Sequence, residues 1–159
     1  DIVNYARTKL NIIDDPRYWT IAGFSNGGAC AFTWGTQYPQ IWGNIMSISG
    51  DRFPGVETQN QTLQDVYGGD RAAYDAAKPA AWIEKNKGKF AGHVAIFTAG
   101  EKDSLFLPDS TDNAALARKA GFTTTLYIVP GADHSAVALQ AGLAKAFEVL
   151  YPVVGLAPQ

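Results

Sequence analysis

The chain has 159 residues, of which 47% are hydrophobic and 18% are charged. This is enough apolar material for one globular domain with a buried core. Lys and Arg number 13 against 15 Asp and Glu, a balance that excludes a strongly basic nucleic-acid-binding protein. The single cysteine, Cys30, excludes an intramolecular disulfide and a cysteine-based zinc site.

The first part of the chain predicts a helix, a strand and a second helix. Asp1–Leu10 has the apolar spacing of a helix. Tyr18–Ala22 is nearly all apolar and rich in residues that favour strands, so we expect a strand buried on both faces. A tight turn at Gly23–Gly28 follows, and Ala29–Tyr38 predicts a helix that ends before Pro39.

The middle of the chain predicts a strand, a long loop and two short helices. Asn44–Ser49 reads as a second buried strand. Arg52–Tyr67 is rich in Gln, Asn, Thr, Gly and Pro, which favours a loop. Arg71–Ala77 predicts a helix capped by Asp70, and Pro79 is suited to begin another helix that ends near Lys87.

The last part of the chain alternates strand and helix twice more. The predicted strands are His93–Ala99 and Thr123–Val129, and the predicted helices are Ser110–Ala120 and Ala136–Tyr151. Four such alternations indicate an α/β fold, with a mostly parallel sheet of about four strands and helices on both faces. Functional sites in such sheets gather at the carboxyl ends of the strands.

The turn after the first predicted strand contains the motif G-x-S-x-G, from Gly23 to Gly27. Between a buried strand and a helix, this motif predicts a sharp turn that lifts the hydroxyl of Ser25 above the sheet, with both glycines making room. The backbone N–H of Asn26 would then lie where an oxyanion forms. The alternative is a turn-capping serine in a phosphate-binding loop, but the glycine spacing is not that of a dinucleotide-binding or P-loop fingerprint.

Two further strand ends carry an acid and a histidine. Asp103 lies in the loop after the third predicted strand, where a carboxylate can orient a histidine. Glu101 in the same loop and Asp51 after the second strand are competing candidates. His134 follows the fourth strand, whereas His93 begins a strand and is interpreted as a surface residue. The order Ser, Asp, His is that of α/β-hydrolases.

Three segments together resemble an α/β-hydrolase: GFSNGG at 23–28, GEKDSLF at 100–106 and PGADHS at 130–135. More narrowly, they are similar to the esterase family that includes esterase D, feruloyl and enterochelin esterases and the mycobacterial mycolyltransferases. The stretch YGGDRAAYDAAKPAAWIEKN at 67–86 also resembles that family. The resemblance implies that Ser25 is the nucleophile, Asp103 the acid and His134 the base.

The resemblance has one departure, because the family's nucleophile turn follows the fifth strand and here it follows the first. We therefore expect residues 1–159 to be the C-terminal portion of one catalytic domain, with the N-terminal strands and the second oxyanion donor missing. The strand Tyr18–Ala22 would then be a bare apolar edge, which favours pairing with a second copy of the chain as a homodimer.

Residues 52–92 are expected to form a loop and helix insertion over the active face. Four residues are candidates for substrate binding: Phe24, Trp82, Leu105 and Phe106. For the aromatic side chains of the insertion, packing within the domain is the alternative to substrate contact. These side chains are Phe53, Tyr67, Tyr74 and Trp82.

Three functions remain open from the sequence. The first is a serine esterase that cleaves a small-molecule acyl ester through an acyl-enzyme. The second is an acyltransferase that resembles the mycolyltransferases, and the third is a non-catalytic binding or assembly module. No cofactor and no metal are expected, because two isolated histidines do not make a metal site. The compartment stays open, with a slight preference for secretion or the cell envelope.

Overall fold

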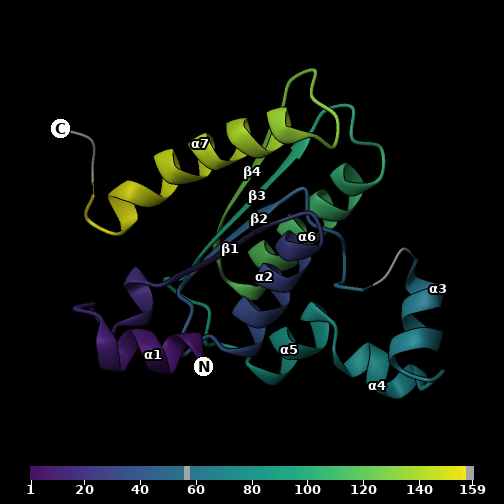
Figure 1. The fold of residues 1–159 in the computed structure, drawn as a ribbon, viewed down its shortest axis with the longest axis horizontal. Coiled ribbons are helices and arrows are strands. Elements are labelled where there is room, and N and C mark those ends of the chain that lie inside the picture. Colours follow the sequence, from purple (N-terminus) through teal and green to yellow (C-terminus); the bar gives the residue numbers. More distant parts are fainter. Residues whose placement is uncertain (56–57, 157–159) are drawn as a thin grey trace.

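The computed structural model describes residues 1–55 and 58–156. Four parallel strands form its sheet in the spatial order β1-β2-β3-β4, which is also their order in the chain. They are β1 (Thr20–Phe24), β2 (Asn44–Ile48), β3 (Val94–Gly100) and β4 (Thr123–Val129). Because all four strands run in the same direction (Figure 1), their carboxyl ends lie at one end of the sheet. The predicted parallel sheet is confirmed.

Helices cover both faces of this sheet (Figure 1). One face carries α2 (Asn26–Gln37) and α6 (Phe106–Ala120), with α5 (Pro79–Lys85) packed against α2. The other face carries α7 (Ala136–Val153). The two layers follow from the strand sequences, because β2 and β3 present apolar side chains alternately to each face.

The core is divided by the sheet into two parts. Ile45 and Phe97 point toward α2 and α6, where the ring of Phe97 meets the ring of Phe32 edge-on at 5.0 Å. Met46 and Ile96 point the other way, toward α7. All four side chains of the strands are at most 1% exposed, so β2 and β3 form a rigid support for the loops at their carboxyl ends.

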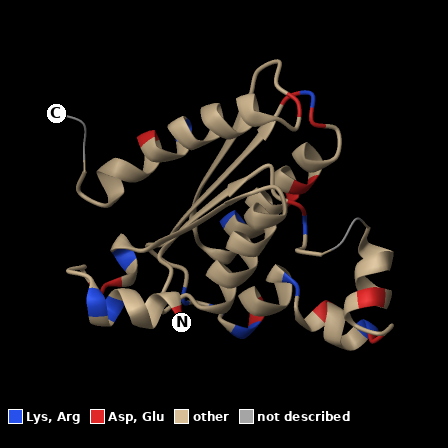
Figure 2. Ribbon diagram, viewed as in Figure 1, with Lys and Arg blue, Asp and Glu red and all other residues tan. Residues whose placement is uncertain are grey.

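Helix α7 carries few charges, among them Lys145 and Glu148, and is mostly uncharged along its length (Figure 2). Its length and hydropathy alone would allow it to cross a membrane. Ala138, Gly142, Ala146 and Leu150 are nevertheless buried, and α7 contacts β2, β3 and β4. We therefore describe it as the helix that covers this face of the sheet.

Strand β1 lies at the edge of the sheet, as expected. The prediction that it spans Tyr18–Ala22 and is buried on both faces was wrong. Residues Pro16–Tyr18 form a 3₁₀ turn (η1) capped by Asp15, after helix α1 (Ile2–Lys9). The strand is only half-buried and Ala22 is exposed, because β1 is an edge strand and α7 packs on β2, β3 and β4. Pairing with a second copy stays a prediction.

The chain between β2 and β3 contains more helix than its composition indicates. The expected loop over Arg52–Tyr67 includes two short helical turns, α3 (Gln59–Gln61) and the π-helical η2 (Thr62–Val66). The hydroxyl of Thr58 caps the first of them by accepting a hydrogen bond from the backbone N–H of Gln61. Helix α4 (Arg71–Ala76) is capped by Asp70, as predicted.

Two helices begin earlier than predicted. Helix α2 begins at Asn26 instead of Ala29. The sequence pattern did not include its first turn because the glycines there have low helix propensity. Helix α6 begins at Phe106 instead of Ser110. There the carboxylate of Asp103 accepts a hydrogen bond from the N–H of Phe106 at 3.1 Å, and Pro108 fits in the first turn because the N–H groups there need no carbonyl partner.

Candidate active site

The turn between β1 and α2 holds Ser25 in a strained backbone conformation. Its φ is 57° and its ψ is −125°, a region that residues with a side chain rarely adopt. The backbone N–H of Ser25 donates to the carbonyl of Ile48 at 2.9 Å, which fixes the turn to the end of β2. This sharp turn between strand and helix, which we call the elbow, is the one that the G-x-S-x-G motif predicted.

The glycines of the motif have unequal roles. A Cβ on Gly23 would lie 2.1 Å from the carbonyl oxygen of Gly27, so Gly23 permits the close crossing of strand and helix. A Cβ on Gly27 would meet nothing within 4 Å, so the prediction that both glycines make room was wrong for Gly27. Gly28 is the second tight position, with a Cβ site 3.0 Å from the Cα of Gly50.

The structure brings Ser25, Asp103 and His134 into one hydrogen-bonded chain. His134 Nε2 lies 3.0 Å from Ser25 Oγ, and His134 Nδ1 lies 2.9 Å from Asp103 Oδ2. An ionised carboxylate can only accept, so Nδ1 carries the hydrogen and Nε2 is free to accept from the serine hydroxyl. The Asp103 side chain is 2% exposed and the His134 side chain 31%, which places a buried acid behind a solvent-accessible imidazole.

The competing acids are engaged elsewhere. Glu101 accepts a hydrogen bond from the N–H of Gly131 at 2.7 Å and so braces the loop that carries His134. The same two loops are joined by the N–H of Lys102, which donates to the carbonyl of Ala132 at 2.7 Å. Gly100 allows this approach, because a Cβ there would lie 2.4 Å from the Ala132 oxygen.

Asn26 is the first residue of α2, a position whose backbone N–H has no carbonyl partner one turn earlier in the helix. That N–H is therefore available to an oxyanion formed beside Ser25. The side chain of Asn26 has a separate role, since its oxygen accepts from the N–H of Gly55 at 3.3 Å. This bond ties the start of the 52–92 segment to the elbow.

Comparison with known proteins places this geometry in a known fold. No family model matches the chain. A ferulic acid esterase superposes with a TM-score of 0.72 at 17% identity, over 96% of this chain and 58% of that one. The chain has part of the α/β-hydrolase fold. An S-formylglutathione hydrolase from Staphylococcus aureus matches with a TM-score of 0.65 at 18% identity, over 96% of this chain and 57% of that one.

Two further proteins are similar to this chain. A prolyl endopeptidase matches with a TM-score of 0.73 at 18% identity, over 98% of this chain and 24% of that one. An uncharacterized protein of Corynebacterium glutamicum is 30% identical over 152 residues, which are 93% of this chain and 35% of that protein. The chain therefore spans little more than half of the esterases' length and about a third of its curated relative.

The four residues predicted to bind substrate occupy different places in this fold. Phe24 ends β1 and Phe106 begins α6, and both rings stack on the imidazole of His134. Leu105 is 74% exposed, next to Phe106. Trp82 does not join the site: it lies in α5, where the ammonium of Lys85 is 4.7 Å from its ring centre.

The 52–92 segment covers less of the site than expected. Its first residues contact the elbow, but α5 packs against α2, and Asn86 donates to the carbonyl of Thr36 near the far end of that helix. Phe53 and Tyr74 are buried and meet edge-on at 5.0 Å, with Tyr67 5.5 Å from Tyr74. These three rings pack on one another, which is the alternative that the sequence left open.

His93 is not the surface residue that the sequence suggested. Its ring lies 6.2 Å from that of Phe90 and 6.1 Å from that of Phe122, and burial lowers the pKa of its imidazole from 6.5. The sequence did not indicate that His93 is partly buried, because its contacts come from residues that precede and follow β3 in the chain.

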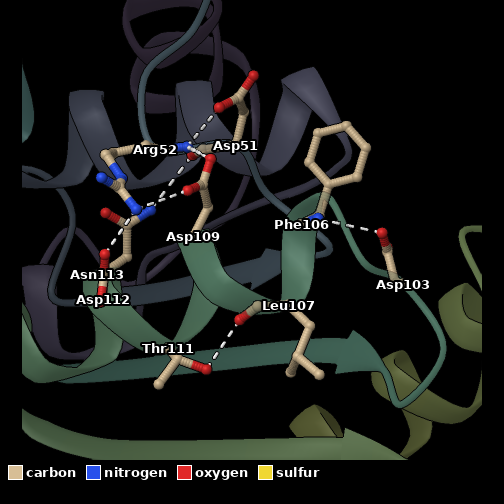
Figure 3. Close-up of polar contacts among 9 residues, drawn as sticks. All are labelled: Asp51, Arg52, Asp103, Phe106, Leu107, Asp109, Thr111, Asp112 and Asn113. Atoms are coloured by element: carbon tan, nitrogen blue, oxygen red, sulfur yellow. Dashed lines mark hydrogen bonds and ion pairs between the residues drawn. The ribbon is translucent and has the colours of Figure 1, made fainter.

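A charged cluster beside the site was not predicted from the sequence. Figure 3 shows Arg52 next to Asp109 and Asp112, which its guanidinium contacts at 2.9 and 2.6 Å. Asp51 lies against Asp109, and burial together with a hydrogen bond to Asp109 raises the pKa of Asp51 from 3.8 to about 6. The Arg52 N–H donates to both Asp51 and Asp109, at 2.7 and 3.0 Å. The cluster joins the end of β2 to the first turns of α6.

This pair makes stability depend on pH. The pKa of Asp51 is higher in the folded chain than in the unfolded chain, so its protonated form stabilises the fold at low pH, and that stabilisation is lost as the pH rises through about 6. We expect Asp51→Asn to raise the free energy of unfolding by about 1 kcal/mol at about pH 8 and by less at about pH 5.

Urea denaturation at the two pH values measures this difference. The control is Asp65→Asn, which replaces an exposed acid on η2. An equal gain for Asp51→Asn at both pH values would show that folding does not raise the pKa of Asp51.

Proposed function

We propose that this chain carries the catalytic triad of a serine esterase. The observation that supports the proposal most strongly is the pair of distances from His134, 3.0 Å to the Ser25 hydroxyl and 2.9 Å to the Asp103 carboxylate. A strained serine on an elbow, an imidazole in the accepting tautomer and a buried acid are the three parts that acyl transfer needs.

The proposed reaction begins when His134 Nε2 takes the proton from Ser25 Oγ as that oxygen forms a bond to the ester carbonyl carbon. The carbonyl oxygen gains the electron pair, and the Asn26 N–H donates to the resulting oxyanion. Asp103 stabilises the imidazolium and keeps its orientation. The imidazolium then gives its proton to the departing alcohol, which leaves an acyl group on Ser25.

In the second half of the reaction, His134 takes a proton from water, whose oxygen attacks the acyl carbon. The bond between that carbon and Ser25 Oγ then breaks, the imidazolium returns its proton to Ser25 Oγ, and the acid is released. The 31% exposure of the His134 side chain supports water as the acceptor in preference to transfer to a larger alcohol. The second oxyanion donor belongs, in this proposal, to a part of the protein outside this chain. A missing donor lowers the rate by on the order of 10²–10³, so the chain alone should be a slow enzyme.

Hydrolysis of p-nitrophenyl acetate tests the proposal. We expect the chain to release p-nitrophenol faster than buffer does, and Ser25→Ala to remove that excess. The matched control is Ser104→Ala, which replaces an exposed serine in the loop beside Asp103 and should leave the rate unchanged. Equal turnover above the buffer rate by wild type and Ser25→Ala would exclude Ser25 as the nucleophile. A wild-type rate equal to that of buffer would favour the non-catalytic module.

A further inference from the structure

The base of the proposed triad lies in a loop, yet the two nitrogens of its ring must face two different partners. His134 falls between the end of β4 at Val129 and the start of α7 at Ala136. Its Nδ1 must face Asp103 while its Nε2 faces Ser25, so both the position and the tilt of the ring matter. The two hydrogen bonds restrain the edges of the imidazole but not its two faces.

Those two faces are occupied by aromatic rings. The Phe24 ring lies 4.9 Å from the imidazole centre at an interplanar angle of 20°, and the Phe106 ring lies 4.3 Å away at 30°. Both arrangements are stacked, and the two phenyl rings make no ring contact with each other. Two rings stacked on the same face would contact each other, so we place one ring on each face of the imidazole.

The two rings come from elements that are fixed independently. Phe24 is the last residue of β1, one residue before the nucleophile, and it pairs in register with Ile48 of β2. Phe106 is the first residue of α6, and its backbone N–H donates to Asp103 Oδ1 at 3.1 Å (Figure 3). The second oxygen of the same carboxylate accepts from His134. Asp103, Phe106 and His134 thus form a closed unit.

We propose that Phe24 and Phe106 are positioning residues that clamp the imidazole of His134 in the orientation the triad requires. The inference rests on the proposed function and adds to it two residues that restrain the base. Ring faces carry partial negative charge, so the same two contacts also favour the imidazolium formed during turnover. A leucine fills much of the volume of either ring but provides no flat face.

Kinetics of the leucine variants test the clamp. We expect Phe106→Leu and Phe24→Leu each to lower kcat for p-nitrophenyl acetate by on the order of 10-fold, with little change in KM, because a displaced base slows the chemical step. Phe106→Tyr and Phe24→Tyr retain a stacking face and should restore most of kcat. The control is Phe122→Leu, which removes a core ring stacked on Phe90 and should leave kcat unchanged.

Proton NMR of the His134 Nδ1–H provides a readout that does not need turnover. In the wild type this proton, held against Asp103, should give a downfield, slowly exchanging signal. It should broaden or vanish in Phe106→Leu and persist in Phe122→Leu. If the wild type shows no turnover but the signal behaves this way, the clamp stands and the proposed function fails. If the leucine variants keep both kcat and the signal, the clamp is overturned.

Discussion

Replacing Asp103 with asparagine should lower the rate of ester hydrolysis by on the order of 10⁴-fold while leaving the chain folded. The carboxylate accepts from His134 Nδ1 and so leaves Nε2 free to receive the Ser25 proton. An asparagine amide can instead donate to Nδ1, which places the hydrogen on Nε2 and blocks proton transfer. The asparagine oxygen can still accept from the Phe106 N–H, so α6 should keep its first turn.

The rate of reaction with a fluorophosphonate measures this effect even if turnover is slow. Asp51→Asn is the matched control, because Asp51 also follows a strand of the sheet but is bound to Asp109 and not to the histidine. It should react at the wild-type rate. If Asp51→Asn reacted slowly and Asp103→Asn normally, the assignment of the acid would be reversed.

Replacing Gly23 with alanine should destabilise the chain by about 3 kcal/mol or more. The new Cβ would lie 2.1 Å from the Gly27 oxygen and 2.2 Å from its carbon, and both are backbone atoms that can move only if α2 shifts away from β1. That helix packs closely on both β1 and β2, so such a shift would also open the core on this face.

Gly27→Ala is the comparison variant from the same motif. Its Cβ would meet no atom within 4 Å, and Gly27 lies in the first turn of α2. An alanine there should be neutral or should stabilise the chain by up to about 1 kcal/mol. Urea denaturation of the two variants separates the roles of the glycines. Equal midpoints would mean that the elbow is not closely packed at Gly23.

The sequence was sufficient to predict the sheet and to select three residues that the structure joins by hydrogen bonds, because those signals are local. A buried strand followed by G-x-S-x-G and a helix specifies an elbow wherever it occurs. Parallel strands then place Asp103 and His134 at the same end of the sheet as Ser25. The sequence favoured Asp103 over Glu101 and Asp51 but could not exclude the other two acids, since the choice depends on where each carboxylate points.

What the sequence did not reveal depends on contacts between distant segments. Asp51 and Asp109 are separated in the chain by α3, η2, α4, α5 and β3, so the contact between their carboxyl groups leaves no local pattern. Phe24 and Phe106 were expected to bind substrate, and their stacking on His134 depends on contacts between β1, α6 and the loop after β4. The early start of α6 has the same origin, because the N–H of its first residue, Phe106, donates to the carboxylate of Asp103.

The reactivity of one hydroxyl tests the central claim most directly. The chain is incubated with a fluorophosphonate and digested, and the modified peptides are identified by mass spectrometry. The account predicts one modified residue, Ser25, with the modification absent after Ser25→Ala and strongly reduced after His134→Gln. Modification of other serines instead of Ser25, or an undiminished rate at Ser25 without His134, would contradict the proposal that these side chains act as a triad.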